Sequence, residues 1–87
     1  MAIVWIPAQL RELTGGCETL SVPGSTVGEV IDSLDDLYAG IKSRLCDANG
    51  LRPGLAVAVD TQIAPLGLKQ SLTDASEVHF VPAVSGG

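Results

Sequence analysis

The chain has 87 residues, of which 46% are hydrophobic and 17% are charged, and its formal net charge is −5 at pH 7. A chain so short and so rich in aliphatic residues is neither disordered nor long enough for a repeat array or a multilayer enzyme, which favours a binding or carrier module with a single core. Its five basic residues are scattered along the sequence, so we expect no surface for nucleic acid or for an anionic membrane.

The N-terminal part of the chain predicts a β-hairpin. Residues Ala2–Ala8 are rich in β-branched and aromatic side chains and form the first predicted strand. A turn at Gly15 and Gly16 follows. Cys17–Val22 then alternates polar and apolar residues at a period of two, which indicates a second strand.

The clearest helix signal begins at Thr26. Thr26 and Glu29 have the spacing of a capping box, in which the hydroxyl accepts from a backbone N–H three residues on and the carboxylate reaches back. Apolar residues then recur at helical spacing, and Gly40 is placed to cap the C-terminus. The apolar stripe holds Val27, Val30, Ile31, Leu34 and Leu37, and the solvated face holds Asp32, Asp35 and Asp36.

The second half of the chain predicts several short elements separated by turn residues. In chain order they are a helical turn at Ile41–Leu45, a loop at Asp47–Pro53, a strand at Leu55–Asp60, a short return strand at Gln62–Ala64, an irregular stretch at Leu66–Ser76 and a last strand at Glu77–Val81. Pro82 stops this last strand because proline has no N–H to donate to a ladder.

One helix for four or five strands predicts an α+β domain in which the helix covers one face of a mixed sheet. Residues 1–82 would form this domain and residues 83–87 a flexible tail. Strand alternation assigns two faces to the sheet. The helix-facing set is Val4, Ile6, Leu20, Val22, Leu55, Val57, Val59, Val78 and Phe80, and the open face would carry Ile3, Trp5, Ala56, Ala58, His79 and Val81.

The open face is the candidate partner-binding surface. An apolar patch with one aromatic anchor is typical of protein interfaces, so we expect partners to contact Trp5, Ala56, Ala58, His79 and Val81. The alternative is that the segment Leu66–Leu72 folds over these residues as a satellite core.

The isolated titratable residues carry weaker signals. His79 can act as an acid or base near pH 7, but no nucleophile accompanies it, so it is more simply a surface residue. Cys17 and Cys46 form no C-x-x-C pair, and there is no second histidine, so we expect no metal site. Without a leader or a spanning segment, the expectation is a cytoplasmic protein with two free thiols.

The last two residues, Gly86 and Gly87, are the strongest chemical signal. The bland interpretation is a frayed tail. The functional interpretation is a C-terminal carboxylate that another enzyme activates, since glycine lacks a Cβ and lets the backbone approach a foreign active site closely. Val84, Ser85, Gly86 and Gly87 extend over about 13–14 Å, which is enough to enter a partner.

Three stretches together resemble the MoaD/ThiS-like family of β-grasp, ubiquitin-like sulfur carriers. VWIPAQLRELTGG (Val4–Gly16) is similar to the family's first strand and loop, Ser25–Leu45 to its single helix and the turn after it, and EVHFVPAVSGG (Glu77–Gly87) to its last strand and Gly-Gly tail. IPAQLRELTGG and PAVSGG look most like carriers of the CysO type, which supply sulfur for cysteine biosynthesis. AQLRELTG also resembles the small subunit of molybdopterin synthase.

Two turns depart from the family pattern. Asp60 and Thr61 stand where many members have Asn-Gly, and Asp74 and Ala75 stand where many have Asp-Gly. Both changes are local to turns, so they affect the expected loop conformations and not the tail.

The resemblance implies a carrier that is not itself an enzyme and binds no cofactor. An E1-like adenylating enzyme of the MoeB/ThiF type would adenylate the Gly87 carboxylate with ATP, and sulfur would displace AMP to leave a thiocarboxylate. A sulfur-accepting synthase, either a cysteine synthase or the molybdopterin-synthase large subunit, would take the sulfur. Gly86, Ser85 and Val84 would thread into these partners. A ubiquitin-like protein modifier and a non-covalent interaction module are the alternatives.

Overall fold

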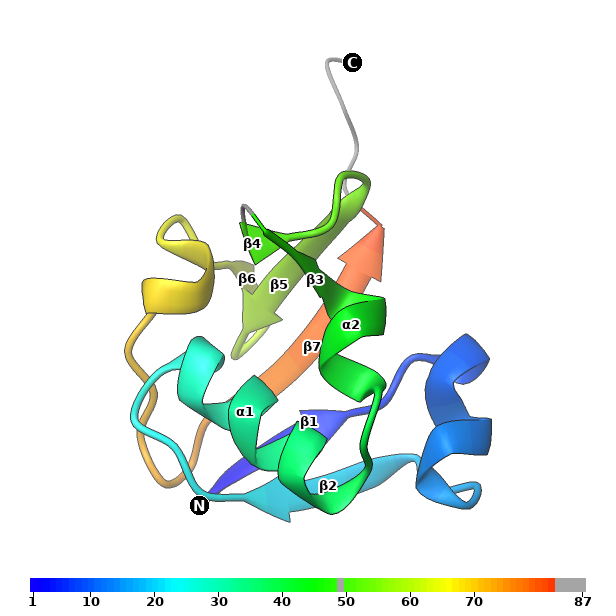
Figure 1. Cartoon of the computed structure of the whole chain (residues 1–87). Coiled ribbons are helices and arrows are strands. Elements are labelled where there is room, and N and C mark those ends of the chain that lie inside the picture. Colours follow the sequence, from blue (N-terminus) through cyan, green and yellow to red (C-terminus); the bar gives the residue numbers. More distant parts are fainter. Residues whose placement is uncertain (49, 83–87) are drawn as a thin grey trace.

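A five-stranded mixed sheet with its helices on one face forms the centre of the computed structural model, which describes residues 1–48 and 50–82 (Figure 1). The predicted tail, residues 83–87, lies outside the described residues. The elements in chain order are β1 (Ala2–Trp5), the 3-10 helix η1 (Ala8–Thr14), β2 (Thr19–Val22), α1 (Val27–Leu37), α2 (Ile41–Leu45), β3 (Cys46–Asp47), β4 (Gly50–Leu51), β5 (Leu55–Val59), β6 (Gln62–Ile63), the 3-10 helix η2 (Gly67–Lys69) and β7 (Glu77–Pro82).

The sheet has the strand order β2-β1-β7-β5-β6. The first and last strands, β1 and β7, are parallel neighbours in the middle of the sheet, and the other pairs are antiparallel. The α+β prediction is confirmed, with five strands in the main sheet. A separate pair, β3 with β4, occupies part of the stretch predicted as a loop.

Helix α1 begins where the capping signal predicts. The Thr26 Oγ1 accepts a hydrogen bond from the Glu29 N–H at 3.2 Å, which satisfies one of the unpaired donors of the first turn. The Glu29 carboxylate reaches back to the Ser25 N–H at 3.1 Å, one residue before the N-cap. The capping-box prediction therefore holds, with this shift of one residue in the return bond.

The C-terminal end of α1 differs from the prediction. Its cap residue is Tyr38, while Gly40, with φ 101°, precedes α2 instead. Asp35 explains this turn, because its Oδ1 accepts from the Gly40 N–H at 3.0 Å and from the Lys42 N–H at 3.1 Å. Asp35 is thus a capping residue of α2 and not simply part of a solvated face. The chain turns away so early that Leu37, expected in the core, is 60% exposed.

The core lies between α1, α2 and the inner face of the sheet. Each large aliphatic side chain buried there stabilises the fold by roughly 1.5–3 kcal/mol before entropy is counted. The helices contribute Val27, Val30, Ile31, Leu34, Ile41 and Leu45, and the sheet and its extension contribute Val4, Ile6, Val22, Val57, Val78 and Phe80. The rest of the predicted helix-facing set, Leu20, Leu55 and Val59, is partly buried against this core.

The first two strands are shorter than predicted. β1 ends at Trp5, and Pro7, with φ −56°, leads into η1 where strand was expected up to Ala8. Leu10 on η1 is buried, so this helical turn closes one end of the core. β2 begins at Thr19 and not at Cys17.

The segment Leu66–Leu72 covers the helix side and not the open face. Leu68 and Leu72 pack against the core, and η2 contacts α1. A Cβ on Gly28, in the first turn of α1, would lie 3.2 Å from the Leu68 carbonyl oxygen, so glycine lets the two segments approach closely. The satellite-core alternative is therefore wrong, and the outer face of the sheet stays uncovered by this segment.

The described helices are all short. The longest, α1, has 11 residues. In the part of the chain that the structure describes, no helix has the length and hydropathy needed to cross a membrane.

Candidate functional site

The register of the sheet aligns one row of side chains across all five strands on the open face. Trp5 pairs with Thr19 on one side and with His79 on the other, and His79 pairs with Ala58, which pairs with Ile63. Directly paired residues point to the same face of a sheet. The open face therefore has a continuous band that runs from β2 to β6.

Trp5 and His79 form the centre of this band. Their rings stack with centroids 5.1 Å apart and an interplanar angle of 13°. The Trp5 Nε1 donates a hydrogen bond to the Glu77 Oε1 at 3.1 Å. These two contacts restrict the indole, which is still 39% exposed, so a partner can bind Trp5 without ordering a free side chain.

The other predicted open-face residues contribute unequally. Ile3 is exposed, and Ala56, His79 and Val81 are half-buried. Ala58 is only 8% exposed, because its small side chain sits in the row between His79 and Ile63, so it offers a partner little contact area. The structure places all of these residues on one face, as predicted.

Ile63 is a surface residue that sequence reasoning missed. It is 61% exposed and ends the row on β6. Strand β6 has only two residues, too few for an alternation pattern to assign a face. The two-residue turn after β5 could have predicted its position, because such a turn fixes the pairing register and so places Ile63 opposite Ala58.

That turn, Asp60-Thr61, also anchors the start of β7. Both residues have positive φ, 51° and 72°, as a two-residue hairpin requires. The Asp60 N–H donates to the Glu77 carbonyl oxygen at 2.9 Å, and the Asp60 Oδ1 accepts from the Glu77 N–H at 2.9 Å. The paired bonds hold Glu77 in place beside Trp5.

A shallow hollow of about 290 Å³ lies at the other end of β7, beside Pro82. It is lined by Pro7, Gln9, Gly54, Leu55, Phe80, Val81 and Pro82. The predicted threading and reactive residues, Val84, Ser85, Gly86 and Gly87, lie outside the described residues.

The two cysteines have different environments. Cys17 is exposed and Cys46 is buried, and both are free thiols. Burial raises the pKa of the Cys46 thiol, so it is a poor nucleophile at neutral pH. Among the described residues, no three His, Cys, Asp or Glu side chains come together in a way that could hold a metal ion.

Comparison with known proteins identifies the family. The ThiS family model matches residues 4–87. The chain belongs to the ThiS family. Two curated relatives of this ThiS-family chain, both named sulfur carrier protein CysO, come from Mycobacterium tuberculosis and Mycobacterium bovis. Each is 36% identical over 89 aligned positions, which cover 97% of this chain and 96% of the relative.

Solved structures give the same assignment. In the crystal structure of the Amycolatopsis orientalis BexX/CysO complex, the matched chain is 34% identical with a TM-score of 0.88, and both chains are fully covered. Mycobacterium tuberculosis CysO is 33% identical with a TM-score of 0.86, over 97% of this chain and all of the other. Small archaeal modifier protein 1 of Methanosarcina acetivorans is 28% identical with a TM-score of 0.78, over 99% and 95%.

These findings confirm the resemblance stated from the sequence. The fold is the β-grasp of these neighbours, and the relatives with the CysO name match along essentially the whole chain. The CysO branch is the one that the motifs IPAQLRELTGG and PAVSGG indicated.

Proposed function

We propose that this ThiS-family chain carries sulfur as a thiocarboxylate on the carboxyl group of Gly87 and donates it in cysteine biosynthesis. The observation that supports this is the likeness to sulfur carrier protein CysO over 97% of the chain, together with a family match that runs to residue 87. The sulfur is bound covalently to the chain, which acts as the carrier in the cytoplasm.

The chemistry needs no catalytic group on the carrier. The Gly87 carboxylate attacks the α-phosphorus of ATP in the activating enzyme, and pyrophosphate leaves. Hydrosulfide then attacks the acyl carbon, the bond to AMP breaks, and the proton of hydrosulfide goes to solvent. The resulting thiocarboxylate is an anionic nucleophile at neutral pH, so it needs no general base of its own.

Two partners must reach the same tail. An E1-like adenylating enzyme of the MoeB/ThiF type would load the sulfur, and a cysteine synthase would accept it. Both would hold the open face at Trp5, Ala56, Ala58, His79 and Val81. Val84, Ser85 and Gly86 would thread Gly87 into their active sites. The complex of an Amycolatopsis orientalis relative with BexX supports assembly with a second protein.

Intact-mass analysis tests the proposal. The purified chain is incubated with ATP, sulfide and the MoeB/ThiF-type enzyme encoded in the same genome. We expect the mass change of one oxygen replaced by sulfur, located on Gly87 by fragmentation. The chain lacking Gly86 and Gly87 is the control. Sulfur transfer that survives this deletion, or a wild-type chain that stays unmodified, refutes the proposal.

The sulfur acceptor is tested separately. The thiocarboxylated chain is mixed with a cysteine synthase or with a molybdopterin-synthase large subunit, because AQLRELTG also resembles the small subunit of molybdopterin synthase. We expect sulfur loss from Gly87 with the cysteine synthase. Loss only with the molybdopterin-synthase subunit assigns the chain to that pathway instead.

A second candidate function is protein modification, in which Gly87 is joined to lysine side chains of other proteins. The 28% identity to a small archaeal modifier protein favours it. Higher-mass conjugates in lysate that disappear when Gly87 is deleted would support this role. If no conjugates form under conditions that yield the thiocarboxylate, the protein-modifier role is excluded and the carrier role remains.

A further inference from the structure

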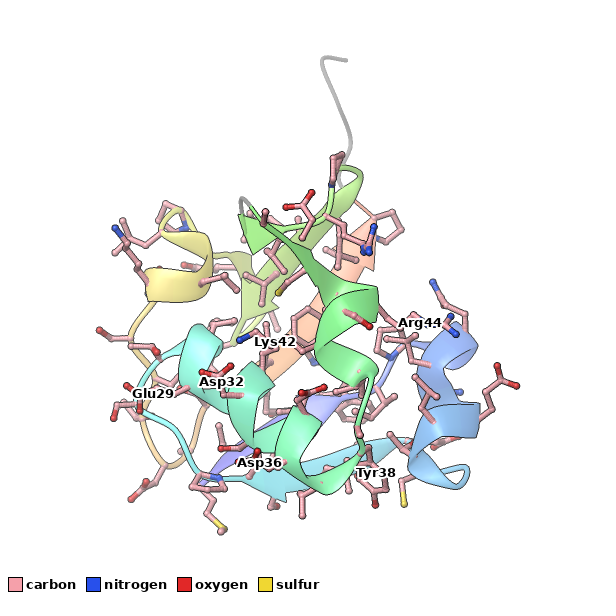
Figure 2. All side chains as sticks on the ribbon, in the orientation of Figure 1. Glu29, Asp32, Asp36, Tyr38, Lys42 and Arg44 are labelled. Carbon is pink, nitrogen blue, oxygen red and sulfur yellow. The ribbon has the colours of Figure 1, made fainter. Side chains whose placement is uncertain are left out.

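Charge is distributed very unevenly between the two layers of the fold. In the described part of the chain, the five strands of the main sheet hold one formally charged side chain, Glu77. All five basic residues lie outside these strands: Arg11 on η1, Lys42 and Arg44 on α2, Arg52 between β4 and β5, and Lys69 on η2. Figure 2 shows Lys42 and Arg44 in the helical layer, together with Glu29, Asp32 and Asp36 of α1.

Glu77 lies on the open face beside its aromatic anchor. It pairs with Ile3 in the register of β1 and β7, and its Oε1 accepts the 3.1 Å hydrogen bond from the Trp5 Nε1. Its side chain is exposed, and none of the described cationic groups forms an ion pair with it. The one hydrogen bond from Trp5 leaves the second carboxylate oxygen available.

A partner that covers Trp5 must also remove water from this carboxylate. An ionised carboxylate taken out of water without a counter-charge opposes binding, and one neutral donor from an indole does not offset that loss. A cation on the partner would offset this loss of hydration, because the free oxygen of the carboxylate can accept a hydrogen bond from an arginine or a lysine. In the part of the chain that the structure describes, no lysine or arginine lies on the five strands and no cation pairs with Glu77.

We propose that the partner surface that docks on the open face is an apolar patch bearing an arginine or lysine that pairs with Glu77 at the edge of Trp5. This inference rests on the proposed function and adds the chemistry of the partner. The formal charge of −5 on the carrier agrees with a cationic partner surface. Glu77 then sets the orientation of docking, since it is the one formally charged side chain on the five strands described.

The test uses charge neutralisation on each layer. Glu77→Gln keeps the side-chain oxygen that accepts from Trp5 and removes the negative charge. Asp36→Asn changes the net charge equally on the exposed face of α1, in the opposite layer, where no hydrogen bond of the Asp36 side chain is described. Association with the MoeB/ThiF-type enzyme that loads sulfur is measured by surface plasmon resonance at low and high salt, alongside the KM and kcat of loading.

We expect Glu77→Gln to slow association several-fold at low salt, to weaken the salt dependence and to raise the KM for the carrier about tenfold, with kcat retained. Asp36→Asn should match the wild type. Circular dichroism and the emission of the single tryptophan verify that both variants are folded. Equal effects of the two substitutions, or a Glu77→Gln chain that binds as tightly as the wild type, overturn the inference. In either case a wild-type chain that still gains sulfur leaves the proposed function intact.

Discussion

At the residue scale, the turn between β5 and β6 places a β-branched residue in an unfavourable conformation. Asp60 and Thr61 both have positive φ. Aspartate tolerates this region, and Asp60 is also held by its two bonds to Glu77. Thr61, with φ 72°, has no such tolerance, because its branched Cβ crowds the following carbonyl.

Replacing this threonine should stabilise the protein. We expect Thr61→Gly to raise the free energy of unfolding by about 0.5–1 kcal/mol, because relief of the crowded Cβ exceeds the chain entropy that glycine adds. Urea denaturation followed by circular dichroism measures the change. Asp60→Gly is the contrast, since it loses the bond to the Glu77 N–H and should not stabilise. A Thr61→Gly chain that unfolds more easily than the wild type contradicts the argument.

The two thiols should react at very different rates. A disulfide reagent at neutral pH should modify Cys17 quickly and Cys46 only after the chain is unfolded, because Cys46 is buried and its thiol pKa is raised. Each modified cysteine releases one thiolate from the reagent, and the absorbance of this thiolate gives the number of cysteines that have reacted. Cys17→Ser should remove the fast phase, and Cys46→Ser should remove the phase that needs denaturant. Two equally fast phases in the native wild type would disprove this.

The same raised pKa predicts a loss of stability at alkaline pH. The ordinary value for the Cys46 thiol is 9.0, and in the folded chain it is higher, so the unfolded chain releases the proton first. The stabilising contribution is fully present below the unfolded value and is lost as pH rises through the folded value. Urea denaturation at neutral and alkaline pH should show a larger loss for the wild type than for Cys46→Ala. Equal losses in both chains would remove Cys46 as the cause.

At the scale of single elements, side-chain caps decide where α1 and α2 begin. Thr26 supplies the acceptor for the first turn of α1, and Asp35 supplies two bonds at the start of α2. Both helices are short, so each bond at an end is a large share of their local stability. The N-terminal signal was visible in the sequence as a T-x-x-E motif, whereas the role of Asp35 depends on the path that the chain takes after α1.

Removing the N-cap should therefore be measurable. We expect Thr26→Ala to lower the free energy of unfolding by about 1 kcal/mol, since the Glu29 N–H loses its acceptor. Thermal or urea unfolding provides the value. Ser25→Ala, which loses only a 3.3 Å contact between its hydroxyl and Glu29, should cost less. The capping assignment is wrong if Ser25→Ala proves the more damaging of the two.

At the scale of the whole molecule, the two layers have separate tasks. The helical layer and the inner side of the sheet form the core, while the outer side of the sheet presents Trp5, His79 and Ile63 in one row. This division lets a chain of 87 residues combine one core with the proposed docking surface. The reactive group of the proposed carrier is then the chain end itself, for which partners provide the pocket.

The proposed docking surface should respond to loss of Trp5, its aromatic anchor. We expect Trp5→Ala to raise the KM of sulfur loading by at least tenfold with little change in kcat, because a central tryptophan contributes strongly to binding and takes no part in the chemistry. Steady-state kinetics with the activating enzyme measure both constants. Leu37→Ala is the matched control, an exposed apolar residue at the end of α1. If both variants lose the same amount, the open face is not the docking surface.

Patterns along the chain predicted much of this architecture. Alternation in the strands correctly predicted which face of the sheet is buried, from Val4 in β1 to Phe80 in β7. Of the five residues in the predicted apolar stripe of α1, four lie in the core and Leu37 is exposed. These predictions succeeded because periodicity depends only on local geometry. The predicted end of the first strand was wrong. The chain forms η1 there because Leu10 packs into the core, and that contact is not encoded by any local pattern.

The sequence by itself determined the α+β class, the start of α1, the two faces of the sheet and the family, since alternation, capping motifs and the Gly-Gly ending are properties of neighbouring residues. Only the tertiary structure decided the strand order, the row from Trp5 to Ile63 and the position of Glu77 against the indole. The reason is physical: Trp5 and Glu77 are 72 residues apart, and only the parallel pairing of the first and last strands brings them together.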